Sequence, residues 1–65
     1  MRQARNPLNG TVVEVEKGVD GRMIVSDVYL EGGTHAVSYN RIDALRLALF
    51  NAQVAVAIME ELEAE

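Results

Sequence analysis

The residue whose chemistry stands out in this chain is Arg5, near the start of a polar lead-in. Its guanidinium is a planar fork of donors that stays charged, which suits it to hold a tetrahedral oxyanion beside backbone N–H groups. Composition alone favours a simpler interpretation, in which Arg5 is a solvated side chain on a mobile arm. The residues around Arg5 determine whether it belongs to a binding site or to a free arm.

No other residues form a recognisable catalytic set. The chain has one histidine, His35, with no nucleophile marked out beside it, and the hydroxyls of Thr11, Ser26 and Ser38 lack the context of a nucleophile elbow. With no cysteine, thiolate metal sites are excluded, and with one histidine a structural zinc is not expected. The sequence therefore predicts a protein that is not an enzyme.

Size and charge narrow the class of protein further. A chain of 65 residues is one domain, and it buries only about 60% of the surface that its unfolded form exposes. Because 49% of its residues are hydrophobic and no disulfide is available, we expect an apolar surface that other copies of the chain cover. A net charge of -4 and few aromatic residues argue against a nucleic-acid partner. Nothing resembles a signal peptide or is long enough to span a bilayer, so we expect a cytoplasmic protein with no membrane partner.

The first part of the chain indicates an arm followed by a hairpin. Residues 1–8 form the arm, in which Pro7 favours an extended backbone. Valines alternate with polar residues over 11–16, which predicts a strand with one solvated face. The turn chemistry of residues 18–21, with an Asp-Gly pair, then suits a tight reversal.

Residues 22–30 predict a second strand, and it is apolar on both faces. In so small a chain this implies a barrel with a subunit contact on its outer side, or a bulge near Ser26 and Asp27 that exchanges the faces. A glycine pair makes the next reversal, and residues 34–39 predict a third strand. A helix follows, because Asn40 is a good N-cap and apolar residues then recur at helical spacing.

The stretch after this helix start has two interpretations. As a helix, its apolar positions continue through Ala52, Val56 and Met59, which gives one long helix from residue 41 toward the C-terminus. As a strand, Val54, Val56 and Ile58 alternate with smaller residues. We favour a closing strand, because β-branched residues at every second position suit a pleated sheet. The acidic residues 60–65 are then a solvated tail.

The opening of the chain also resembles a known family. Residues 3–18 follow the pattern Ser-Ala-Arg-Asn-x-Leu-x-Gly-x-Val-Val-x-Val-x-x-Gly, which is similar to the start of the Mop domain of the TOBE superfamily. Residues 35–39, 41–47 and 54–61 resemble later Mop segments more weakly. Proteins made only of Mop domains are called molbindins.

The resemblance implies a mainly β fold, a small OB-like β-barrel with one short helix, in a strand-exchanged homo-oligomer, most often a hexamer. It also implies that molybdate or tungstate is held at subunit interfaces by hydrogen bonds alone. In that site Ala4 provides main-chain donors, Arg5 the charge, and Asn6 an amide that orders the arm. The motif brings this interpretation of Arg5 level with that of a free arm.

The chain departs from the Mop pattern at several site positions. Gln3 stands where the family has a serine that donates to the oxyanion, and it can still donate through a longer side chain. The family lysine aligns with Met59, and the serine after it falls on Glu60 or Glu61, which would repel an anion. His35 could replace part of the missing charge when protonated.

Two functions follow for the single domain 1–65. The first is a molbindin-like oligomer that binds a molybdate or tungstate oxyanion for storage or homeostasis, with oxyanion-binding residues Gln3, Ala4, Arg5, Asn6 and His35. The second is a small oligomerisation or protein-interaction module that has lost oxyanion binding and docks through Leu45, Leu47, Leu49 and Phe50. The corresponding alternative fold is a β-hairpin sheet with a long C-terminal helix.

Overall fold

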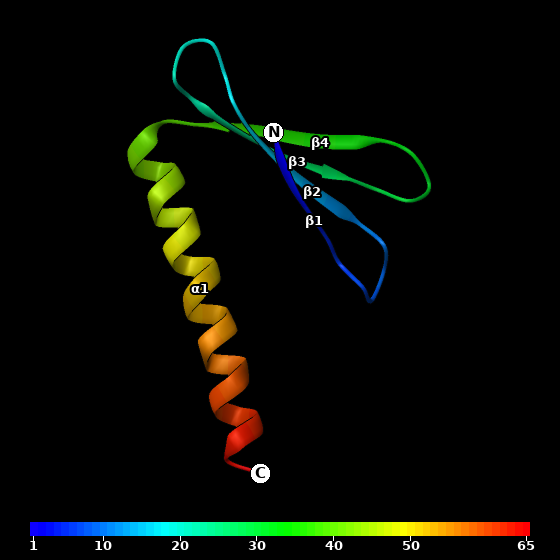
Figure 1. Ribbon diagram of the computed structural model, residues 1–65, viewed down its shortest axis with the longest axis vertical. Coiled ribbons are helices and arrows are strands. Elements are labelled where there is room, and N and C mark those ends of the chain that lie inside the picture. Colours follow the sequence, from blue (N-terminus) through cyan, green and yellow to red (C-terminus); the bar gives the residue numbers. More distant parts are fainter.

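The computed structural model describes residues 1–65 and consists of a four-stranded antiparallel sheet followed by one long helix (Figure 1). The strand order in the sheet is the order in the chain, so each connection is a hairpin and the sheet is open, with β1 and β4 at its edges. The elements are β1 (Arg2–Arg5), β2 (Val12–Lys17), β3 (Met23–Val28), β4 (Thr34–Tyr39) and α1 (Arg41–Glu63).

Glycines make the two central hairpin turns, as the sequence predicts. Gly21 has a φ of 82°, a left-handed conformation that side chains with a Cβ rarely adopt, and the Gly18 N–H donates to the Arg22 carbonyl at 2.8 Å. Gly32 and Gly33, at φ values of 94° and 93°, close the β3–β4 hairpin. These turns fix the register of three strands.

The pairing of β3 is continuous on both sides. Ser26 lies opposite Glu14 on β2 and Ala36 on β4, with no extra residue inserted. The bulge considered near Ser26 and Asp27 is therefore absent, and the side chains alternate between faces along the whole strand.

Both faces of the sheet carry half-buried apolar residues, and the cross-strand partners align a set of valines on one of them. Val13, Val15, Val25 and Val37 share this face and are half-buried, with Tyr39 at its end. No residue of the chain is fully buried. The sheet therefore has the beginnings of a core without a second layer to complete it.

The closing strand that the sequence favoured over 54–58 is wrong, because these residues lie inside α1. The strand preference of Val54, Val56 and Ile58 loses to helix propagation, in which each added residue gains a hydrogen bond at little cost once the first turn exists. The sheet of this chain is consequently open, not a closed OB-like barrel. The architecture is the alternative one, a sheet with a long C-terminal helix.

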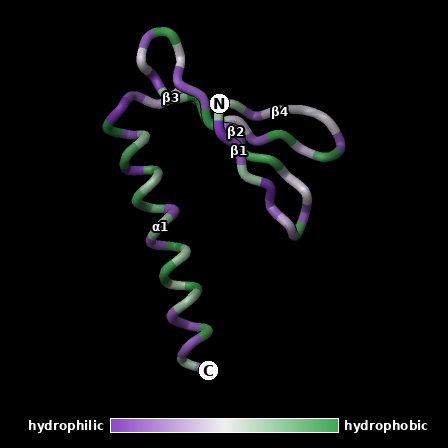
Figure 2. Tube along the Cα trace, viewed as in Figure 1, coloured by the Kyte–Doolittle hydropathy of each residue, from purple (hydrophilic) through white to green (hydrophobic).

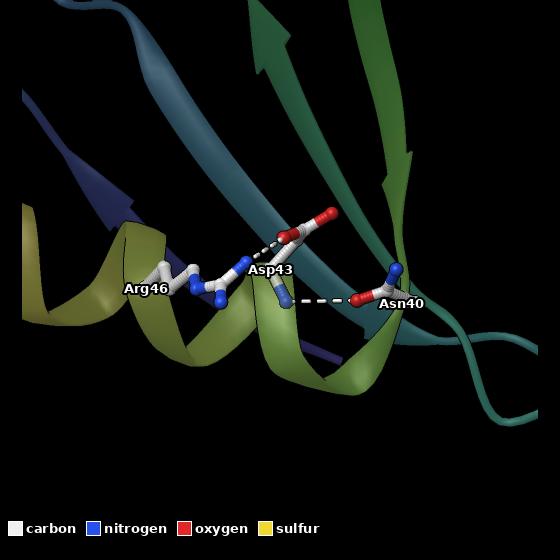
Figure 3. A network of polar contacts seen from close by, with 3 residues as sticks. All are labelled: Asn40, Asp43 and Arg46. Atoms are coloured by element: carbon white, nitrogen blue, oxygen red, sulfur yellow. Dashed lines mark hydrogen bonds and ion pairs between the residues drawn. The ribbon is translucent and has the colours of Figure 1, made fainter.

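The first turn of α1 is built as the sequence predicts. The Asn40 Oδ1 accepts the Asp43 N–H at 2.8 Å, which makes Asn40 the N-cap (Figure 3). The Asp43 carboxylate pairs with Arg46 Nη1 at 3.2 Å and does not return to the cap. A helix nucleated this firmly at one end can continue through residues of moderate helix propensity.

Both ends of the chain are more regular than expected. Half of the N-terminal arm forms β1, which pairs with β2 from Arg2 opposite Val15 to Arg5 opposite Val12. At the other end, α1 continues to Glu63 and takes in most of the acidic tail. The arm is thus an edge strand of the sheet.

The molecule is far from compact. Its Cα radius of gyration is 14.0 Å, against about 11 Å for a compact chain of this length. Figure 1 shows the reason, since α1 leaves the sheet at the end of β4 and extends away from it, so that the C-terminus lies far from every strand. Only the first turns of α1 lie close to the sheet, at β4.

Candidate functional site

The predicted oxyanion residues lie on and beside the edge strand β1. Gln3 and Arg5 project from the same face of the sheet, and Arg2 and Ala4 from the other, because side chains alternate along a strand. The Arg5 guanidinium donates from Nη1 to the Gly10 carbonyl at 3.1 Å. One nitrogen is thus used to brace the β1–β2 turn, and the side chain as a whole is exposed.

The β1–β2 turn satisfies three of its own backbone donors. The Asn6 Oδ1 accepts the Leu8 N–H at 2.9 Å, the Gly10 N–H donates to the Asn6 carbonyl at 2.8 Å, and the Asn9 Oδ1 accepts the Thr11 N–H at 2.9 Å. Asn6 therefore orders the turn. These three N–H groups are not free to bind an anion.

Free backbone donors remain at the outer edge of β1. The Asn6 N–H points to β2, where it donates to the Thr11 carbonyl at 2.7 Å. Because N–H directions alternate in an antiparallel ladder, the Ala4 N–H also points to β2, and those of Gln3 and Arg5 point to the open edge. The main-chain donors assigned to Ala4 thus belong to the ladder, and the available ones belong to its neighbours.

His35 is not brought near Arg5. It lies on β4, the opposite edge of the sheet, and its register opposite Asp27 and in line with Val13 and Ala4 places it on the face opposite to Arg5. Within one chain, the five predicted residues therefore form a cluster at β1 and a separate histidine. Only neighbouring copies could bring the two together.

The free edge of β4 is partly covered by Arg22. Its Nε donates to the Ser38 hydroxyl at 2.7 Å, and its Nη2 donates to the Ser38 carbonyl at 3.0 Å. A charged side chain over an edge strand discourages pairing with other sheets. Sequence analysis missed this residue, because its partner is sixteen positions away.

The largest uncovered feature of the molecule is α1. None of its residues is buried, and its exposed large apolar side chains keep between 42% and 61% of their surface. Figure 2 shows hydrophobic positions along most of its length. They are Ile42, Leu45, Leu49, Phe50, Val54, Val56, Ile58, Met59 and Leu62.

By length and composition alone, α1 could also cross a membrane. The expectation that no stretch is long enough to do so does not hold for this helix, although core helices of soluble proteins meet the same criterion. No group of histidine and acidic side chains is arranged to hold a metal ion.

Comparison of the chain with protein-family models, with curated proteins and with solved structures gives no match. The similarity to Mop domains therefore rests on the motif over residues 3–18 and its weaker continuation.

Proposed function

We propose that this protein is a non-enzymatic interaction module, in which a small sheet holds α1 out as a docking helix for a protein partner. The observation that carries this proposal is the complete absence of buried residues from a helix of 23 residues with large apolar side chains. Helices in proteins owe most of their stability to the packing of an apolar face. A helix of this kind therefore needs a partner surface.

The uncovered area has the size of a protein interface. The chain exposes 5519 Å², whereas a compact folded protein of 7.1 kDa exposes about 4,100 Å². The excess of about 1,400 Å² exceeds the roughly 800 Å² that each partner buries in a standard interface, and falls in the range of obligate complexes. The excess belongs to the whole chain, and nine of its fourteen exposed large hydrophobic residues lie on α1.

A protein partner fits α1 better than a lipid bilayer does. The uncharged stretch between Arg46 and Glu60 spans about 20 Å at a rise of about 1.5 Å per residue, which is short of the hydrocarbon thickness of about 30 Å. Asn51 and Gln53 lie in the middle of this stretch, where a bilayer would leave their amides without partners. A protein surface can supply those partners.

The test measures whether formation of α1 depends on association with a partner surface. Circular dichroism and sedimentation equilibrium are recorded together from nanomolar to millimolar chain concentration. We expect the helix signal, about a third of the chain when complete, to rise as the chain associates. A protein that stays monomeric with its helix fully formed at every concentration would contradict the proposal, because its helix would need no partner. Flotation of the protein together with phosphatidylcholine vesicles would also contradict the proposal, because it would indicate a membrane partner.

A second function, binding of a tetrahedral oxyanion such as molybdate or tungstate, is favoured by one observation. The Gln3 amide, the Arg5 guanidinium and the outward N–H groups of these two residues lie together at an unpaired edge. A second copy of the chain brought to this edge would double the set of donors, in the manner that the resemblance to molbindins implies. The site would then lie between subunits of a homo-oligomer, which the resemblance to Mop domains implies to be a hexamer.

Calorimetric titration with molybdate, tungstate, sulfate and phosphate tests this second function. Arg5→Ala removes a charged hydrogen bond worth about 1.5–3 kcal/mol, so binding should weaken by roughly tenfold to 150-fold. Arg2→Ala is the matched control, since Arg2 has the same charge on the other face of the same strand. Equal losses of affinity in Arg5→Ala and Arg2→Ala would show that net charge, and not a site at Arg5, causes the binding. The absence of heat with every anion would exclude the function.

A further inference from the structure

We propose that the partner of α1 is a second copy of this chain, and that the two α1 helices pair in antiparallel orientation. This inference rests on the proposed interaction function and adds the identity and direction of the partner. The contact is made by a seam of six apolar residues, Ile42, Leu45, Leu49, Ala52, Val56 and Met59.

The seam has the spacing of a helix-pairing surface. Its residues alternate three and four positions apart along α1, which is the heptad pattern of helices that pack side by side. The seam also points away from the sheet of its own chain. The half-buried positions of α1 are Ala44 and Leu47, and Leu47 lies roughly 200° around the helix from Leu45 at 3.6 residues per turn. The seam is therefore free to receive another molecule.

A shallow, open recess borders the seam, and a copy of the seam can fill part of it. The recess is lined by three seam residues and by three residues beside the seam: Leu49, Ala52 and Val56, and Gln53, Ala57 and Glu60. In an antiparallel pair that matches Ile42 with Met59, the next layers match Leu45 with Val56 and Leu49 with Ala52. A leucine of each chain then enters the recess of the other, as a knob enters a hole.

The charges of α1 select the antiparallel direction. Its N-terminal end carries Arg41 and Arg46 with one carboxylate, Asp43, which pairs with Arg46, whereas its C-terminal end carries carboxylates alone, from Glu60 onward. The C-terminal carboxylates and Arg41 oppose the helix dipole, so the acidic end in particular is unfavourable in a lone helix. An antiparallel neighbour places each basic end beside an acidic end. A parallel neighbour would instead collect the carboxylates of both chains at one end.

Cysteine cross-linking tests the direction, and the chain offers a clean background because it has no cysteine. Leu45→Cys and Val56→Cys are made as two separate variants, oxidised alone and as a mixture, and analysed by mass spectrometry. Antiparallel pairing predicts a mixed disulfide in the mixture and none in either variant alone, since like positions then lie about 16 Å apart along the axis. Disulfide-linked dimers in the samples of each single variant would indicate parallel pairing and overturn the inference. The absence of disulfides from all three samples would overturn it as well.

Charge reversal tests the same point without touching the seam. Glu60→Lys with Glu61→Lys lowers the repulsion between acidic ends, so a parallel pair would become tighter. An antiparallel pair would instead bring lysines beside arginines, and we expect its dissociation constant to rise at least tenfold. Adding Arg41→Glu, which leaves the Asp43–Arg46 ion pair intact, should lower the dissociation constant again. The two lysine substitutions suit the dipole of the lone helix better, so weaker pairing of that variant cannot be attributed to a less stable helix.

Native mass spectrometry of the wild type separates the two levels of the proposal. A dimer, or a larger even assembly, whose cross-links and charge variants behave as in a parallel pair would overturn the inference and leave the interaction function standing. A monomer whose circular dichroism shows a complete helix would overturn both. An odd assembly, such as a trimer, would also overturn the inference, because antiparallel pairs require an even number of chains.

Discussion

Truncation of Leu49 gives the sharpest measure of how much α1 contributes to association. The Leu49 side chain is 60% exposed in the single chain and sits in the middle of the seam. Full burial of a leucine is worth about 1.5–3 kcal/mol, so covering the exposed part contributes about 1–2 kcal/mol. Leu49→Ala retains the Cβ and forfeits about 1 kcal/mol of this in each chain, or about 2 kcal/mol in a dimer. The dissociation constant should therefore rise roughly 30-fold.

Sedimentation equilibrium of the wild type and Leu49→Ala measures this change directly. Leu8→Ala is the matched control, because Leu8 is 94% exposed on the β1–β2 turn and far from the seam. Alanine favours a helix at least as well as leucine, so the substitution at residue 49 does not weaken α1 itself. A dissociation constant of Leu49→Ala within threefold of the wild-type value, or an equal change in Leu8→Ala, would refute this contribution of Leu49.

Three further substitutions test the fold that presents α1. Asn40→Ala removes the cap hydrogen bond to Asp43 and should lower stability by about 1 kcal/mol, seen as an earlier loss of helix signal on heating. Gly10→Ala, at a φ of 75° and with a new Cβ 2.6 Å from Leu30 Cδ1, should cost about 1–2 kcal/mol in urea unfolding. Arg22→Ala uncovers the edge of β4, and static light scattering should show more aggregation than in the wild type. An unchanged melting curve, an unchanged urea midpoint or unchanged scattering would contradict the respective role.

Local chemistry was enough to predict much of the sheet. The turns at residues 18–21 and at Gly32 and Gly33 follow from backbone conformations that glycine alone adopts without cost. The strand over 34–39 and the cap at Asn40 follow from alternation and from a side chain that bonds its own helix. Each of these features depends on residues close together in the sequence.

The strand predicted over 54–58 is a case in which local residue propensity does not predict the secondary structure. Val54, Val56 and Ile58 suit a pleated surface, but a strand requires a neighbouring strand with free hydrogen-bonding groups, and propensity does not report whether one is within reach. A helix satisfies its backbone by itself. With a firm cap upstream, the chain takes the structure that needs no distant partner.

The sequence by itself determined the chemistry of the candidate surfaces: the arginine on a polar lead-in, the uncharged middle of the last segment, and the acidic end beyond it. Only the tertiary structure decided how they are arranged. It placed Arg5 and His35 on opposite edges and opposite faces of one sheet, and it left α1 beyond its first turns with no surface of its own chain to cover it. The physical reason is that side-chain chemistry belongs to each residue, whereas burial belongs to pairs of elements. In this fold, the chain has no second element that could pack against α1 beyond its first turns.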